Sequence, residues 1–212
     1  MTINLTSSVP SDFVTTLTIA ADNIRGQTNN QRPSTKAVIE ALLQAEKAAK
    51  QQRLTYPLES LLGNWRLGFA TGTRKVRRGG IVLGRGFYLP KVVPAQISFS
   101  RQLESPQPNE DKGEIGNQIQ FGPILFKLTG PAQFLGKKNL LAFDFTQVQL
   151  RVFGRTVYRG NFRSGTQRED FDRQPITIPF FAFFLVTQDF IAARGRGGGL
   201  ALWIRETSTG DR

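Results

Sequence analysis

The chain has 212 residues, which is long enough for one barrel domain with a modest appendage, and its 28 Lys and Arg against 16 Asp and Glu give a formal net charge of +12. It contains no cysteine and no histidine, which excludes disulfides, thiol catalysis, zinc-finger ligation and every Ser-His or Cys-His nucleophile. The positive charge is compatible with nucleic acid, an anionic membrane, an acidic protein partner or plain solubility, and does not choose among them.

The first residues, Met1 to Leu5, show neither a basic region nor an apolar core. They therefore lack the pattern of a secretory signal and of a transmembrane anchor. We expect any membrane contact of this chain to be peripheral.

Two helices are predicted near the N-terminus, at about residues 12–24, with Ser11 as the N-cap and Gly26 as the stop, and at about residues 34–53. Each carries an apolar stripe, which favours a helical pair packed on the following domain as a plug or a lateral brace. The alternative is a membrane-surface helix. It is less favoured, because the apolar face has no Trp and Phe13 is its one aromatic residue.

Beyond the helices, short segments with strand chemistry are separated by Gly, Pro and Asn. The first begins at Gly63, and its alternation predicts that Trp65, Leu67 and Phe69 share one face. Few helical windows interrupt the series, which favours an antiparallel barrel or sandwich over alternating helices and strands. The predicted strands are residues 63–70, 80–89, 95–103, 114–121, 123–130, 139–152, 155–160, 175–187 and 199–206.

Many of the 17 Phe fall on the predicted inward face of these strands. Alternation also turns two polar residues, Arg101 and Asn117, toward the apolar side, where they need partners or a ligand. A barrel of about eight strands is either filled by such side chains or hollow enough for one small apolar ligand. The candidate ligand-binding residues are Phe87, Phe99, Arg101, Asn117, Phe121, Phe126, Phe145, Phe181 and Phe183.

Two basic clusters have a functional and a plain interpretation. Arg74, Lys75, Arg77 and Arg78 fall in the loop after the first strand, at the expected barrel mouth, where each charge near an anionic membrane contributes about 1 kcal/mol. The plain interpretation is a solvated loop. A second series, Arg151, Arg155, Arg159 and Arg163, lies on predicted strands and a turn, and its interleaved aromatics resemble a nucleic-acid stacking platform. Nucleic acid is disfavoured, because no recognised motif accompanies the series.

The glycine-rich run at residues 195–199 matches no phosphate-binding motif, and strands flank it on both sides. We therefore predict a hairpin turn there.

The run PLESLLGNWRL at residues 57–67, with Gly63 and Trp65, resembles the signature of the plastid lipid-associated protein (fibrillin) family of plastids and cyanobacteria. Near the C-terminus Asp189, Arg194, Gly195 and Gly198 are similar to that family's second signature, although Arg196 stands where the family often has Asp. A Gly-x-Trp at the start of the first strand, here Gly63 and Trp65, also resembles the way a calycin barrel begins. That resemblance implies that Arg205, on the last strand, packs over the first-strand tryptophan by a cation–π contact.

This resemblance implies a mainly β fold, an antiparallel lipocalin-like (calycin) barrel at residues 57–212 preceded by a helical pair at residues 1–56. It implies a non-enzymatic, peripheral protein without metal or cofactor, which binds an apolar lipid, isoprenoid, quinone or carotenoid. The expected location is a thylakoid membrane, a lipid droplet (plastoglobule) or the cytoplasm of a cyanobacterium, or a plastid if the chain is a mature fragment.

Two alternatives stay open. One is an interaction module that docks an acidic partner such as a prenyl-lipid biosynthetic enzyme. The other is a tetrapyrrole or bilin carrier with Arg101 as the propionate partner, which is disfavoured because the chain has no histidine to serve as an axial ligand.

Overall fold

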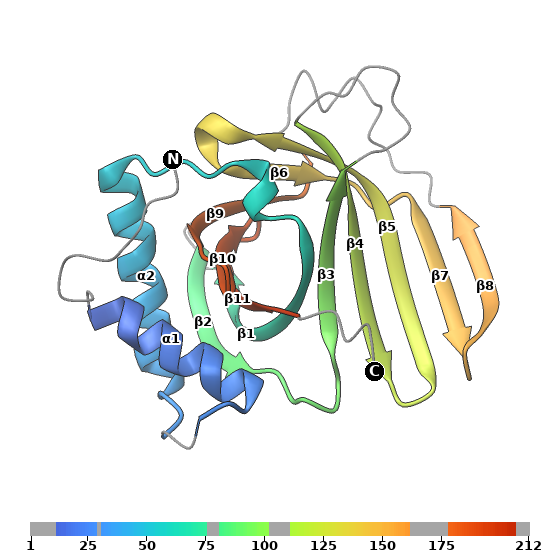
Figure 1. The fold of residues 1–212 in the computed structure, drawn as a ribbon, viewed down its shortest axis with the longest axis horizontal. Helices are drawn as coiled ribbons and strands as arrows, with labels where there is room; N and C mark the ends of the chain where they lie inside the picture. The colour runs from blue at the N-terminus through green and yellow to red at the C-terminus, as the bar shows by residue number, and fades with distance from the viewer. Residues whose placement is uncertain (1–11, 29–30, 76–80, 102–110, 162–177, 207–212) are drawn as a thin grey trace.

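A computed structural model describes residues 12–28, 31–75, 81–101, 111–161 and 178–206, and shows a mainly β structure in which two helices precede a closed antiparallel barrel (Figure 1). The predicted lipocalin-like fold class is therefore confirmed. The helices are α1 (Asp12–Arg25) and α2 (Thr35–Gln52), with 3-10 turns η1 (Leu58–Ser60) and η2 (Gly136–Lys138). The strands are β1 (Gly63–Lys75), β2 (Ile81–Tyr88), β3 (Ala95–Arg101), β4 (Lys112–Phe121), β5 (Ile124–Leu135), β6 (Leu140–Phe143), β7 (Gln147–Val152), β8 (Arg155–Asn161), β9 (Phe180–Val186), β10 (Phe190–Gly195) and β11 (Leu200–Arg205).

Eight strands form the closed ring, in the order β1, β3, β4, β5, β6, β9, β10, β11 and back to β1. The long strand β5 has two partners on one side: residues 124–129 pair with β7, and residues 132–135 pair with β6. As a result β7 and β8 continue outside the ring, together with the adjoining ends of β4 and β5 (Figure 1). We call residues 117–129 and 147–161 the outer sheet. Strand β2 pairs with β1 and also lies outside the ring.

The partner change on β5 explains where the strand boundaries differ from the predicted ones. Pro131 has no N–H to donate, and it stands where β5 leaves β7 for β6, so the strand continues through it to Leu135. At the same place the chain passes from β6 to β7 along one edge of β5, where Asp144 N donates to the carbonyl oxygen of Pro131 at 3.1 Å. The register against β5 shifts by one residue there, and a Cβ at Gly130 would lie 1.9 Å from the carbonyl oxygen of Asp144. The predicted strand 139–152 is therefore two strands, β6 and β7, with a short irregularity between them.

The ring strands separate two apolar cores. The interior core of the barrel includes Trp65, Leu67 and Trp203, whereas the outer core, between the ring and the helices, includes Phe69. The prediction that Phe69 shares a face with Trp65 and Leu67 is wrong. A β-bulge shifts the register between Leu67 and Phe69, and a shift of one residue moves every later side chain to the opposite face.

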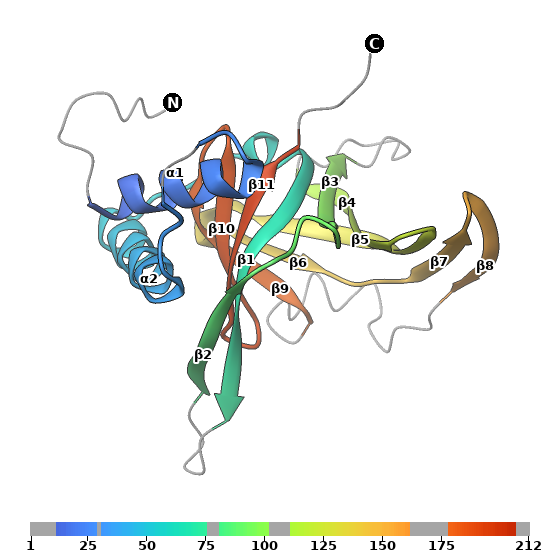
Figure 2. The ribbon, with the colours of Figure 1, turned by 90° about the horizontal axis from the view of Figure 1, so that it is seen from below.

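Both helices lie on the outside of the barrel, as a lateral brace and not as a plug (Figures 1 and 2). Leu17 of α1 and Leu42 of α2 are fully buried against the outer core. The Ser34 side chain accepts a hydrogen bond from Ala37 N at the start of α2, and Arg53 ends the helix in the left-handed conformation. The proposed N-cap of the first helix, Ser11, lies outside the described residues.

One end of the barrel is closed around Trp65. Its side chain is fully buried, and its Nε1 donates a hydrogen bond to the carbonyl oxygen of Leu61 at 2.7 Å. The Arg205 guanidinium carbon lies 3.9 Å from the centre of the Trp65 ring, which is the packing that the calycin resemblance implies. Arg205 also donates hydrogen bonds to the carbonyl oxygens of Ser60, Leu62 and Gln188. We call this the closed end.

Gly63 is required by this arrangement. Its φ is 118°, which only glycine adopts without strain, and a Cβ there would lie 3.0 Å from Nη1 of Arg205.

The closed end yields a first testable prediction, on the free energy of unfolding. Replacing Arg205 by Met keeps an aliphatic contact with Trp65 but removes the charge and three hydrogen bonds, so we expect a loss of about 2 kcal/mol in urea unfolding. Gly63→Ala is expected to lose a similar amount, about 1–3 kcal/mol, through backbone strain. Gly197→Ala is the matched control, because a Cβ there meets no atom within 4 Å. An Arg205→Met variant as stable as the Gly197→Ala variant would contradict this account of the closed end.

Candidate functional site at the open end of the barrel

The interior core becomes more exposed with distance from Trp65. On β1, Trp65 is fully buried and Leu67 is half-buried, and on β9, Phe183 is buried whereas Phe181 is half-buried. Phe145, which follows β6, is also half-buried and packs against the interior core. We call this end of the barrel, opposite η1 and Arg205, the open end.

A connected group of aromatic rings lies at and just below the open end. Phe181 stacks on Phe143 with ring centres 4.9 Å apart, and the Trp203 ring lies edge-on to Phe181 at 5.3 Å. Phe145 contacts Phe143 at 5.3 Å. These rings offer apolar faces and edges to a ligand while the deeper rings stay packed.

Of the predicted ligand-binding residues, the structure brings five to the interior side of the ring. Phe99, Phe145, Phe181 and Phe183 belong to the interior core, and Phe99 and Phe183 meet edge-on at 6.0 Å. Asn117 shares the inward face of β4 with Ile115 and is half-buried. Among the described residues its amide has no hydrogen-bond partner, so it can serve a polar group of a ligand.

Arg101 does not face the interior. It lies at the last residue of β3, at the closed end, where its side chain is exposed and forms an ion pair with Glu59 of η1. The prediction from alternation is wrong here, because the strand ends at this position and a charged group at a strand end reaches water and a counter-charge.

Phe87, Phe121 and Phe126 are also not enclosed by the barrel. Phe87 belongs to β2, outside the ring, and 53% of its surface is exposed. Phe121 and Phe126 do point to the same face as Ile115, but they lie on the outer sheet, with exposures of 68% and 39%. The predicted strand face is correct for Phe121 and Phe126. The prediction that the barrel encloses them is wrong, because β4 and β5 continue outside the ring at these positions and no other ring strand lies opposite them.

The outer sheet continues the apolar inner face of the barrel. Phe121 pairs with Ile124, Ile119 pairs with Phe126, and Phe126 pairs across to Leu150 of β7, so these side chains share one face. Leu150 in turn pairs with Tyr158 of β8. This face was not predicted, although Val148, Leu150 and Val152 alternate along β7. Trp203, which shares its strand face with Ala201, was also not among the predicted ligand-binding residues.

The predicted basic docking loop remains a prediction. Arg74 and Lys75 end β1, opposite Val82 and Ile81 of β2, and Arg77 and Arg78 lie outside the described residues. Figure 2 shows that the β1–β2 hairpin and the outer sheet point in different directions from the barrel.

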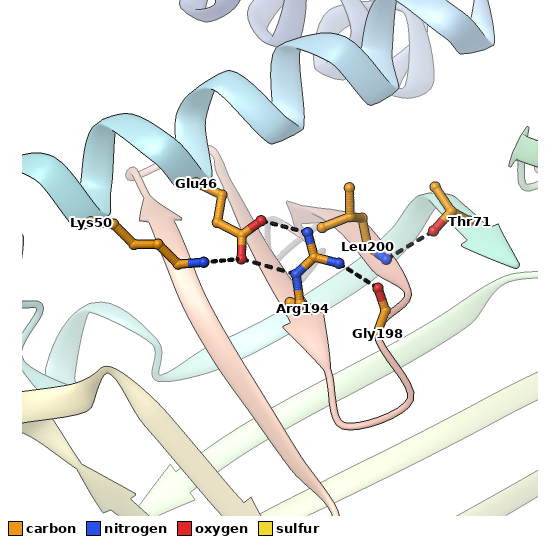
Figure 3. Close-up of polar contacts among 6 residues, drawn as sticks. All are labelled: Glu46, Lys50, Thr71, Arg194, Gly198 and Leu200. Atoms are coloured by element: carbon orange, nitrogen blue, oxygen red, sulfur yellow. Dashed lines mark hydrogen bonds and ion pairs between the residues drawn. The ribbon is translucent and has the colours of Figure 1, made fainter. Parts of the chain in front are cut away.

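The residues of the C-terminal signature connect the barrel to the helices. Arg194 of β10 forms a two-pronged ion pair with Glu46 of α2, with Nε 2.9 Å from Oε1, and its Nη1 donates to the carbonyl oxygen of Gly198 at 2.6 Å (Figure 3). Lys50 also donates to Glu46, at 3.0 Å. The hydrogen bond from Arg194, which outweighs the opposing effect of burial, lowers the pKa of the Glu46 carboxyl.

The other signature residues are structural as well. Asp189 pairs with Arg25 of α1 at 3.2 Å. Gly195 and Gly198 form the β10–β11 turn, in which Gly198 N donates to the carbonyl oxygen of Gly195 at 2.8 Å. Next to this turn, Leu200 N donates to Thr71 Oγ1 at 2.9 Å (Figure 3). The glycine-rich run is thus a hairpin turn, as predicted.

Comparisons with protein-family models, with curated proteins and with solved structures find no match for this chain. In the described part of the chain, neither helix is long and apolar enough to cross a membrane. Over the same residues, no group of three or more acidic side chains gathers into a metal site.

The Glu46–Arg194 pair gives a pH-dependent prediction. Because the pKa of folded Glu46 lies below its ordinary value of 4.5, its stabilising effect is complete above that value and is lost as the pH falls through the folded pKa. We expect Glu46→Gln to lower the free energy of unfolding by about 2 kcal/mol at neutral pH, and the difference from the wild type to shrink in acid.

The measurement is urea unfolding from pH 7 down to about pH 3, the range over which carboxylates protonate. Glu40→Gln is the matched control on the same helix, because Glu40 forms an exposed ion pair with Lys36 at 3.9 Å and should contribute less than about 0.5 kcal/mol. A Glu46→Gln difference that stays constant with pH would count against the role assigned to this pair.

Proposed function

We propose that this protein is a non-enzymatic lipid-binding protein that holds an apolar lipid at the open end of its barrel. One observation carries the proposal: half-buried aromatic rings at the open end continue into an exposed apolar face on the outer sheet. Phe145 and Phe181 belong to the first group, and Ile119, Phe121 and Phe126 belong to the second. A β-barrel of this kind is compatible with ligand binding.

The physical driving force is the removal of apolar surface from water. Covering the exposed part of each ring contributes on the order of 1 kcal/mol, so an elongated ligand that spans several rings binds usefully without any charged contact. Asn117 supplies one amide at the edge of this surface, which suits a ligand with a single carbonyl or hydroxyl group. An isoprenoid, quinone, carotenoid or acyl lipid fits this description.

The fibrillin resemblance extends the proposal to a cellular setting. It supports peripheral association with a thylakoid membrane or a lipid droplet, in a cyanobacterium or a plastid. The absence of histidine and cysteine from the whole chain agrees with a binding role, because it removes the commonest catalytic nucleophile arrangements.

A second candidate is a module that docks an acidic protein partner, such as a prenyl-lipid biosynthetic enzyme. It is favoured by the net charge of +12 and by the buried, packed rings deeper in the barrel. A tetrapyrrole carrier has less support, because Arg101, its expected propionate partner, pairs with Glu59 at the closed end.

Quinone quenching of tryptophan fluorescence tests lipid binding directly. Trp203 lies 5.3 Å from Phe181, whereas Trp65 is sealed at the closed end. We expect a short-chain prenyl quinone to quench Trp203 saturably, and Phe181→Ser to weaken binding about tenfold, which corresponds to about 1.4 kcal/mol. Phe145→Ser provides a second variant at the open end.

Phe87→Ser is the control, because Phe87 is exposed on β2 outside the ring. Binding that is equally weakened in the Phe87 and Phe181 variants, or no saturable binding by the folded wild type, would overturn the proposed site. Trp203→Phe should abolish the quenching while the protein still binds the quinone in equilibrium dialysis.

A further inference from the structure

The outer sheet ends in two hairpin turns that lie side by side. Gly122 and Pro123 connect the paired residues Phe121 and Ile124 in the β4–β5 turn, and Phe153 and Gly154 connect β7 to β8. Phe153 N donates a hydrogen bond to the carbonyl oxygen of Pro123 at 3.0 Å, which holds the two turns together. Both turns lie at the lower right of Figure 1, at the edge of the molecule farthest from the helices.

Phe153 occupies a position that the fold alone does not favour. Its φ is 48° and that of Gly154 is 76°, and a two-residue turn with both φ values positive strongly prefers Asn-Gly. Phe153 is also 80% exposed, so packing of its side chain does little to offset the strain of the positive φ. A large apolar residue that is both strained and exposed points to a role in binding.

Other apolar side chains surround it at the same end. Phe121 is 68% exposed and Ile124 is 43% exposed, and we call Phe121, Ile124 and Phe153 the tip patch. The turn before β3 lies at the same end, because Gln120 N of β4 donates a hydrogen bond to the carbonyl oxygen of Pro94 in that turn. Val92 in this turn is also exposed. The apolar face of the outer sheet runs from the tip patch back to the open end.

The charges around the tip patch have one sign. The outer sheet contains four cationic residues and no acidic residue: Lys127, Arg151, Arg155 and Arg159. Arg151 and Arg155 flank the β7–β8 turn, and Arg151 also donates to the carbonyl oxygen of Gly154, at 2.8 Å from Nη2. The predicted arginine series is thus divided by a hairpin, with Arg163 outside the described residues.

We propose that the outer sheet docks on an anionic lipid bilayer through the tip patch. Phe121, Ile124 and Phe153 enter the boundary between headgroups and acyl chains, while Arg151 and Arg155 contact lipid phosphates. Exposed apolar side chains that protrude from narrow turns, with Arg151 and Arg155 beside one of these turns, match the chemistry of such a boundary. A second copy of this chain fits less well, because four like charges on each outer sheet would oppose each other.

This inference rests on the peripheral membrane association in the proposed function and gives it a surface different from the β1–β2 loop. The tip patch and the open end share one apolar face, so docking here places the barrel next to the source of its ligand.

Co-sedimentation of the full chain with vesicles tests the proposal. The vesicles contain phosphatidylcholine alone or phosphatidylcholine mixed with phosphatidylglycerol. We expect strong binding to the anionic vesicles, and a roughly tenfold loss in Phe153→Asn, a change that suits the turn and so keeps the fold. Arg155→Gln should reduce binding to anionic vesicles and make the remaining binding less sensitive to salt. Phe87→Asn, at an exposed ring outside the tip patch, is the matched control.

Several outcomes would overturn the inference. The first is equal binding of the wild type to neutral and anionic vesicles. The second is unchanged binding in both Phe153→Asn and Arg155→Gln, or equal losses in Phe153→Asn and Phe87→Asn. The third is a protein that does not bind vesicles but forms a dimer that Phe153→Asn dissociates, or binds an RNA oligomer at the tip patch.

Quinone quenching without vesicles separates this inference from the proposed function. Phe153→Asn should bind the quinone like the wild type, because Phe153 lies at the far end of the outer sheet. Wild-type protein that binds the quinone and not the vesicles would refute docking alone, and the reverse pattern would refute the proposed ligand site alone.

Discussion

The contact between the Arg205 guanidinium and the Trp65 ring is the interaction on which the rest of the structure depends. It joins the first and last strands of the barrel, β1 and β11. Arg205 also donates hydrogen bonds to three carbonyl groups, two in the chain before β1 and one in the chain before β10, so both segments are held at the closed end. Gly63 makes room for the guanidinium. These contacts close one end of the barrel, so the ligand in our proposal binds at the other end.

The helices brace the barrel wall from outside and do not enter the interior. They cover the outer side of the ring, where Leu17 and Leu42 meet the outer core. Two ion pairs fix them: Arg25 with Asp189 for α1, and Glu46 with Arg194 for α2. Residues that the sequence associates with a family signature are therefore anchors between barrel and helices, and the ligand site is left to apolar side chains on other strands.

The sequence predicted the features that depend on local chemistry. Periodicity located both helices, the glycine-rich run predicted its hairpin, and the resemblance to calycin barrels led to the Trp65–Arg205 contact. The predictions from sequence were wrong where the position of a side chain depends on how strands far apart in the sequence pair. The bulge after Leu67 moved Phe69 to the other core, and the two partners of β5 left Phe121 and Phe126 outside the ring. Nothing in the local sequence reveals that Glu46 faces Arg194, because their contact spans 148 positions.

The most direct test of the central claim is the composition of the protein as it leaves a host that makes isoprenoids and pigments. The full chain would be purified without detergent, extracted with organic solvent and analysed by absorbance and mass spectrometry. We expect an apolar isoprenoid, quinone, carotenoid or acyl lipid in an amount close to that of the protein, and much less of it in the Phe181→Ser variant. An extract without such a molecule, from folded wild-type protein, would contradict it.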